Sequence, residues 1–230
     1  MPDAPPVLLV HGFASSFERN WREPGWVDIL QEEGREVIGV DLPGHGDAPK
    51  PSDPAAYTEL DVAVEASLPD RPVDAVGFSL GGWVVLRLAS RLPGRFARIV
   101  VGGVGENLFR DEDPEPLARA VETGEAPEGA PEPARAFAQF GRAPGNDRTA
   151  LAAVLRGTSE RLDPVALARV TCPVLVVLGD RDFAGPPQPL VDALPDARLV
   201  EIRGLDHFAT PKDVRFLDAT LEFLSRPAGR

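Results

Sequence analysis

Short apolar runs alternate with amphipathic stretches along most of the chain. Runs rich in Val, Leu and Ile, typical of strands buried inside a sheet, occupy residues 7–10, 36–40, 73–76, 98–104, 173–179 and 197–202. Helical spacing of apolar residues follows these runs over 24–33, 57–68, 83–92, 187–194 and 210–224. This alternation predicts an α/β fold with right-handed crossovers. We expect a mostly parallel six-stranded sheet with helices on both faces.

Two of the predicted helices carry recognisable end signals. Gly34 follows the helix at 24–33 and is expected to form its C-cap. At the last helix, Thr210 is placed as the N-cap, Pro211 at the first position and Asp213 at the third. These signals set the predicted boundaries of the two helices.

The alternation of strands and helices breaks between residues 105 and 163. No strand pattern appears there, and from residue 106 to 132 there are nine acids against two bases. Helical spacing returns at 134–140 and 151–155. A helical insertion of this length between two strands predicts a short lid, 105–163, over the carboxyl edge of a core formed by 1–104 and 164–230. Residues 122–133 alternatively form an acidic linker without regular structure.

Composition and charge narrow the class of protein. The chain has 230 residues, of which 43% are hydrophobic, so it is long enough for one large α/β domain with a full core. Its net charge of -12 argues against nucleic acid and anionic membranes as partners. The single cysteine, Cys172, excludes an intramolecular disulfide and is expected to be a small buried residue. The N-terminal residues lack a basic region and a long apolar run, which predicts a cytoplasmic protein without a membrane span.

Residues 77–82, Gly-Phe-Ser-Leu-Gly-Gly, lie between a predicted strand and a predicted helix. A sharp strand-to-helix turn would hold Ser79 in strained backbone angles, and Gly77 and Gly81 would allow strand and helix to pass closely. The hydroxyl would then lie at the helix N-terminus, where the backbone N–H of Leu80 points at an oxyanion. We interpret Ser79 as a nucleophile. The alternative is a chance turn with the same pattern.

A serine nucleophile needs a histidine base. His207 is the only one of three histidines that follows Ser79 in the chain, and it lies just past a predicted strand. His11 and His45 precede the serine and are expected to make structural hydrogen bonds. The loop that contains His11 also carries Phe13, whose backbone N–H is expected to face the same crevice as Ser79.

The histidine in turn needs a carboxylate to orient it. Asp182 comes three residues after the strand that ends at Gly179, far enough to curl over the sheet edge. Glu106, after the strand at 98–104, is the reserve. Asp180 follows its strand too closely, and Asp206 is adjacent to the histidine, so both are weaker alternatives.

Five ordered motifs together resemble the α/β-hydrolase fold superfamily, in its lipase, esterase and cofactor-free haloperoxidase-like branch; they occupy residues 7–13, 41–46, 77–82, 179–182 and 206–207. The resemblance implies a triad of Ser79, Asp182 and His207, with an oxyanion hole from the Phe13 and Leu80 amides and no metal or organic cofactor. Only six residues precede the first strand, so the two antiparallel edge strands of many relatives are expected to be missing. Relatives that displace halide use an aspartate where this chain has a serine, which favours acyl transfer.

Aromatic residues flank these motifs and predict an apolar pocket lined by Phe78, Trp83, Phe183 and Phe208. The expected activity is hydrolysis of carboxylic esters of small or apolar acyl groups, on a small-molecule substrate, by a monomer or homodimer. The first alternative is a lyase or C–C bond hydrolase with the same three residues, for which Arg110 and Arg181 would bind an anionic substrate. The second alternative is a non-catalytic binding protein of the same fold.

Overall fold

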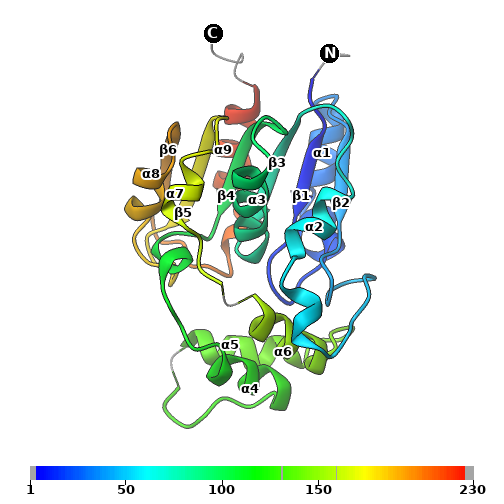
Figure 1. The fold of residues 1–230 in the computed structure, drawn as a ribbon, viewed down its shortest axis with the longest axis vertical. Coiled ribbons are helices and arrows are strands. Elements are labelled where there is room, and N and C mark those ends of the chain that lie inside the picture. Colours follow the sequence, from blue (N-terminus) through cyan, green and yellow to red (C-terminus); the bar gives the residue numbers. More distant parts are fainter. Residues whose placement is uncertain (1–3, 131, 159, 226–230) are drawn as a thin grey trace.

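A parallel sheet of six strands forms the centre of the computed structural model, which describes residues 4–130, 132–158 and 160–225 (Figure 1). The strand order is β2-β1-β3-β4-β5-β6, and every neighbouring pair is parallel. This confirms the predicted α/β fold. The strands are β1 (Val7–Val10), β2 (Val37–Val40), β3 (Val73–Phe78), β4 (Phe96–Gly102), β5 (Val174–Gly179) and β6 (Ala197–Ile202).

The strand β4 begins and ends two residues earlier than expected. It was predicted at 98–104, but it ends at Gly102 because Gly103 takes a φ of +68° and turns the chain away from the sheet. At the same edge of the sheet, Val10 pairs with both Val40 and Gly77. The carboxyl ends of β1, β2 and β3 are therefore level, so the loops that follow them share one edge of the sheet.

Helices cover both faces of the sheet. One face packs against α1 (Trp26–Glu32) and α9 (Val214–Ser225), and the side chains of Val7 and Leu9 point into that layer. Leu8 and Val10 point to the opposite face. That face is covered by α2 (Leu60–Glu65), α3 (Leu80–Arg91), α7 (Pro164–Leu167) and α8 (Gln188–Ala193). Both faces of each central strand are thus buried, which explains its continuous apolar run.

The helix at 57–68 and the last helix both differ from the prediction. Two elements replace the former, a 3-10 turn at Pro54–Tyr57 and α2, with Glu59 between them in a non-helical conformation. Thr210 is not an N-cap, because it opens a separate 3-10 turn and its hydroxyl donates to the carbonyl of Asp206 at 2.8 Å. The α9 helix begins at Val214, and the Asp213 carboxylate accepts from the Arg215 N–H at 2.9 Å.

The insertion between β4 and β5 contains more helix than expected. After a 3-10 turn at Glu106–Phe109 come α4 (Glu115–Thr123), α5 (Glu132–Gly141) and α6 (Arg148–Gly157), which lie together beyond one end of the sheet (Figure 1). The helix α4 was not predicted because its sequence is acidic. Its Glu115 and Glu122 form ion pairs with Arg156 of α6 at 2.9 and 3.0 Å. Arg156 and Arg119 lower the pKa of Glu115 to about 2. Within the segment read as a possible linker, residues 124–130 have no regular structure and residue 131 lies outside the described residues.

Cys172 is free and buried just before β5, as expected. Burial raises the pKa of its thiol to about 12. At about pH 8 only about one thiol in 10⁴ would be the reactive thiolate, so we expect the native protein to resist Ellman's reagent and the unfolded protein to react fully. Rapid reaction of the native protein would contradict the buried position.

In the described ranges of the chain, no helix has both the length and the apolar character needed to cross a bilayer.

Candidate active site

Ser79 stands at a tight turn between β3 and α3. Its backbone has φ 53° and ψ -114°, a strained conformation for a residue with a side chain. The flanking glycines permit the turn. A Cβ atom on Gly77 would lie 2.5 Å from the carbonyl oxygen of Gly81, and one on Gly81 would lie 2.2 Å from that of Val10. The first turn of α3 is therefore pressed against the ends of β3 and β1, which holds the serine out at the sheet edge.

Replacing Gly81 with alanine is expected to lower the free energy of unfolding by about 2–4 kcal/mol, because the new methyl group would meet strand backbone that cannot shift without breaking sheet pairing. Gly94→Ala is the matched control. Unlike Gly81, Gly94 has a positive φ, of 88°, where a side chain is strained, but nothing lies within 4 Å of a Cβ there. Urea denaturation should show a loss of only about 1 kcal/mol for the control. Equal losses would contradict the close approach at Gly81.

The structure brings Ser79, His207 and Asp182 into one hydrogen-bonded chain. The His207 Nε2 lies 3.0 Å from the Ser79 Oγ, and its Nδ1 lies 2.9 and 3.0 Å from the two Asp182 carboxylate oxygens. The Asp182 side chain is fully buried, and the His207 side chain is 6% exposed. A carboxylate on Nδ1 keeps the proton there, so Nε2 is left to accept the proton of the serine hydroxyl.

The alternative acids have other partners. Asp180 accepts a hydrogen bond from the Gly204 N–H at 2.6 Å, and Asp206 accepts one from the Ala209 N–H at 2.9 Å. Glu106 pairs with Arg110. The Ala184 N–H donates to Oδ1 of Asp182 at 2.8 Å and so fixes the carboxylate in a position that contacts His207. Among the four acids considered, Asp182 is the one that contacts His207.

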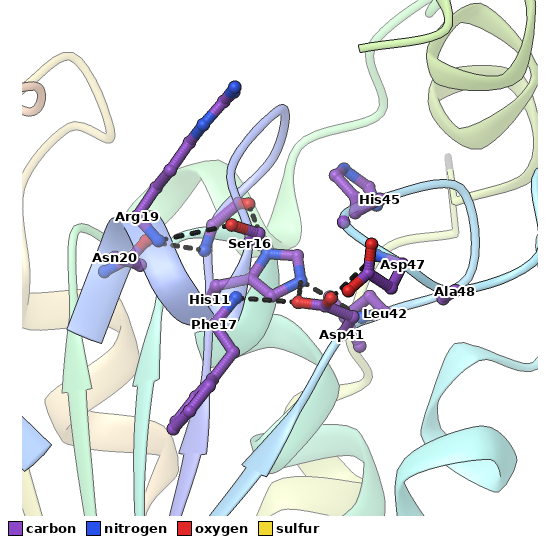
Figure 2. A network of polar contacts seen from close by, with 12 residues as sticks. His11, Ser16, Phe17, Arg19, Asn20, Asp41, Leu42, His45, Asp47 and Ala48 are labelled. Carbon is purple, nitrogen blue, oxygen red and sulfur yellow. Dashed lines mark hydrogen bonds and ion pairs between the residues drawn. The ribbon is translucent and has the colours of Figure 1, made fainter. Parts of the chain in front are cut away.

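The backbone around Gly12 is fixed by two side chains, those of His11 and Asn20, which Figure 2 shows. His11 accepts at Nε2 from the Leu42 N–H at 3.0 Å, so Nδ1 carries the proton and donates to the Gly12 carbonyl at 2.8 Å. Asn20 accepts from the Gly12 N–H at 3.1 Å. In a trans peptide the carbonyl and the next N–H point in opposite directions. Since the Gly12 carbonyl is tied to His11, the Phe13 N–H points away from it.

Neither His11 nor His45 contacts the serine, in keeping with the structural role expected for both. Burial lowers the pKa of His11, so its ring is neutral and Nε2 remains an acceptor. Burial beside His11 lowers the pKa of His45 to about 3, and its Nδ1 donates to the Pro43 carbonyl at 3.1 Å. The His45 ring lies edge-on to Phe13 with centroids 5.7 Å apart. Both histidines therefore support the loop that carries the Phe13 amide.

Two cavities meet at Ser79 and Phe13. The larger, of 430 Å³, is lined by Phe78 and Phe208, and the smaller, of 260 Å³, by Leu80 and Trp83. Phe183 was expected in the pocket but lines neither cavity. Its ring instead lies over the His207 imidazole with centroids 4.3 Å apart, and the residue is 38% exposed. Phe183 thus shields one face of the imidazole from water.

The inserted helices supply contacts that sequence reasoning missed. Phe137 of α5 stacks on Phe13 with centroids 5.2 Å apart and an interplanar angle of 16°. The Asn146 amide donates to the carbonyls of Ala14 at 3.1 Å and Phe140 at 2.9 Å. Ala14 has a positive φ of 56°. Helical spacing marked Phe137 as part of a helix, but no local pattern showed that it or Asn146 would reach the loop after β1.

Charged groups at the smaller cavity are mostly paired. Arg110 lines the smaller cavity and pairs with Glu106 and Glu112, whereas Arg181 lines neither cavity. Neither arginine offers a free cation beside Ser79. In the part of the chain that the structure describes, no three His, Cys, Asp or Glu side chains gather in a way that would hold a metal ion.

Comparison with known proteins identifies a matching family and several similar sequences. Residues 7–219 match the model of the alpha/beta hydrolase family. A pimeloyl-[acyl-carrier protein] methyl ester esterase from Neisseria meningitidis serogroup B is 38% identical over 124 residues, which cover 51% of this chain and 44% of that protein. A haloalkane dehalogenase from Psychrobacter cryohalolentis is 36% identical over 113 residues, 44% of this chain and 34% of that protein. These matches span less than half the length of either relative.

A solved structure matches over almost the whole chain. The 2-hydroxy-6-oxo-6-phenylhexa-2,4-dienoate hydrolase from Rhodococcus sp. strain RHA1 gives a TM-score of 0.73 at 23% identity and covers 99% of this chain and 92% of that one. At this identity the likeness concerns the fold. It shows that the fold of almost the whole chain is one already seen in a solved structure.

Proposed function

Because this chain belongs to the alpha/beta hydrolase family, we propose that it is a serine hydrolase that cleaves carboxylic esters of small or apolar acyl groups. One observation carries the proposal. The Ser79 hydroxyl lies 3.0 Å from the His207 Nε2, and the opposite ring nitrogen faces a buried carboxylate. A hydroxyl placed in this way can lose its proton as it attacks, which a free serine at neutral pH cannot do.

The reaction would proceed in two halves. The Ser79 Oγ attacks the ester carbonyl while His207 takes its proton, and the Asp182 carboxylate stabilises the imidazolium that results. The carbonyl oxygen becomes an oxyanion and accepts from the backbone N–H groups of Phe13 and Leu80. His207 then gives the proton to the departing alcohol, which leaves an acyl-enzyme. Water, activated by the same imidazole, hydrolyses the acyl-enzyme and restores Ser79.

Several features favour ester cleavage over the alternatives. The Neisseria relative is named as a methyl ester esterase. The Psychrobacter relative is named as a haloalkane dehalogenase, but displacement of halide by a covalent route calls for a carboxylate nucleophile, and this chain has a serine hydroxyl at the turn. Of the two arginines considered for the anionic substrate of a C–C bond hydrolase or lyase, Arg110 is paired with Glu106 and Glu112, and Arg181 lines neither cavity.

We also propose that residues 105–163 form a lid over the site of a small-molecule substrate, with the core formed by 1–104 and 164–230. The contact between Phe137 and Phe13 supports this division, because it places α5 directly against the loop that carries the Phe13 amide. Helices in such a position would limit the access of bulk water, which strengthens the electrostatic interactions within the site.

Labelling with a fluorophosphonate probe, followed by an ester assay, tests the proposed activity. We expect one equivalent of probe per chain, attached to Ser79 by peptide mass analysis. Hydrolysis of p-nitrophenyl butyrate should fall in proportion to the labelled fraction, since both depend on the same hydroxyl. A folded protein that neither takes up the probe nor cleaves any p-nitrophenyl ester would overturn the proposal.

A further inference from the structure

The geometry points to a substrate site divided by the stacked rings of Phe13 and Phe137. We propose that the smaller cavity holds the acyl group and that the larger holds the alcohol. We further propose that Arg19 and Lys212, at the larger cavity, select an alcohol that carries a carboxylate or phosphate. This inference rests on the proposed ester hydrolysis and names the substrate class for it.

Ser79 lies at the junction of the two cavities. Ser79 and Phe13 line both, whereas most other lining residues belong to one. Phe137 of α5, which stacks on Phe13, lines only the smaller cavity. An ester carbon bonded to the Ser79 oxygen therefore has room for one substituent on each side of this pair of rings.

The position of His207 decides which cavity holds the alcohol and which holds the acyl group. The bond between Ser79 Oγ and the carbonyl carbon forms, the bond from that carbon to the alcohol oxygen breaks, and the proton taken by His207 must end on that oxygen. The alcohol oxygen must therefore face Nε2. His207 lines the larger cavity and not the smaller, so the alcohol lies in the larger cavity. The acyl chain then points to the opposite side.

The smaller cavity suits a short apolar acyl chain. Its volume of 260 Å³ is below the range usual for pockets that bind drug-sized ligands. Its apolar walls come from Leu80, Trp83, Leu108, Leu117, Phe137 and Leu155. Its two cations are already paired, Arg110 with Glu106 and Glu112 and Arg161 with Asp111. Among the described residues that line this cavity, no unpaired positive charge is left for an anionic acyl group.

The larger cavity has a different charge. It is lined by two cations, Arg19 and Lys212, and by one acid, Glu23. Arg19 is half-buried and donates to the carbonyl of Pro144, and in the described part of the chain Lys212 makes no ion pair. This cavity therefore carries excess positive charge on a chain whose net charge is -12. An anionic group on the alcohol would be attracted to the larger cavity and repelled by most of the remaining, negatively charged surface.

A matched pair of butyrate esters tests the charge preference. We would measure kcat/KM for 4-(butyryloxy)benzoate and for its uncharged carboxamide, and follow their ratio. The double variant R19Q/K212Q is expected to lower the ratio of charged to uncharged ester by about five- to tenfold, and high salt should lower it in the native protein. Arg19→Lys, which keeps the charge, should retain most of the preference. Arg169→Gln, at an exposed arginine a few residues before β5 that lines neither cavity, should leave the ratio as it is.

Two bulky substitutions test the assignment of the cavities. Leu117→Trp would fill the smaller cavity, and Ala143→Trp the larger. We expect Leu117→Trp to shorten the longest acyl chain that is cleaved, and Ala143→Trp to restrict the size of the alcohol. The reverse pattern, or a charge ratio that the double variant leaves unchanged, would overturn this inference while ester hydrolysis itself remained. Absence of both labelling and turnover in the native protein would instead reject the proposed function.

Discussion

Replacement of Ser79 by alanine is expected to lower kcat for ester hydrolysis by about 10⁵- to 10⁶-fold. The variant keeps His207, Asp182 and the two backbone amides but has no oxygen to form the acyl-enzyme. Some rate above that of water should persist, because binding and the oxyanion donors still act on a water molecule. The assay is p-nitrophenyl butyrate hydrolysis, with enzyme purified on a column never exposed to the native protein.

The fold of this variant should be unaffected. Serine and alanine are similarly strained at a φ of 53°, and the Ser79 N–H bonds to the Gly102 carbonyl at 2.8 Å through the backbone alone. The urea midpoint should therefore match that of the native protein. Ser52→Ala, at an exposed serine far along the chain from the turn, is the control for substitution as such. A loss of activity smaller than about tenfold would mean that another group is the nucleophile.

Replacement of Asp182 by asparagine is expected to lower kcat by about 10⁴-fold. The Ala184 N–H donates to Oδ1, so the asparagine oxygen should take that position and its NH₂ the position of Oδ2, which lies 3.0 Å from the His207 Nδ1. The asparagine oxygen would remain 2.9 Å from Nδ1, but the NH₂ group at 3.0 Å competes with it and favours the tautomer that carries its proton on Nε2. His207 would then be unable to accept the serine proton, and the imidazolium would lose its carboxylate.

Asp180→Asn is the matched control for this change, because Asp180 lies two residues away but accepts from the Gly204 N–H. We expect its kcat to remain within about threefold of the native value. Steady-state assays with p-nitrophenyl butyrate give kcat for Asp182→Asn and for Asp180→Asn. A large loss in the control, with a small loss in Asp182→Asn, would place the orienting acid elsewhere.

The sheet and the order of the main elements followed directly from the sequence. Central strands buried on both faces need continuous apolar residues, so β1 and β5 are visible in a few consecutive positions. The turn at Ser79 is also a local feature, because Gly77 and Gly81 are required by backbone contacts within and beside it. Chain order then singled out His207 and Asp182, and the structure places both within hydrogen-bonding distance of their expected partners.

The inserted helices and the cavities depend on contacts between distant residues. The helix α4 was not predicted, because nothing local shows that Glu115 and Glu122 meet Arg156 more than 30 residues later. The start of α9 was misplaced for a local reason, because the Thr210 hydroxyl donates to the carbonyl of Asp206, four residues earlier, and does not cap the helix. The division into two cavities depends on Phe137, whose partner Phe13 lies more than 100 residues earlier.

The stacking of Phe137 on Phe13, together with the bond from Asn146 to Ala14, ties the inserted helices to the loop that carries the Phe13 amide. Movement of α5 away from the sheet would therefore disturb a group proposed to stabilise the oxyanion. We therefore expect the inserted helices to remain against this loop and not to open at an oil–water interface. Turnover should accordingly rise with dissolved ester and level off at the solubility limit, with no interfacial activation when droplets form.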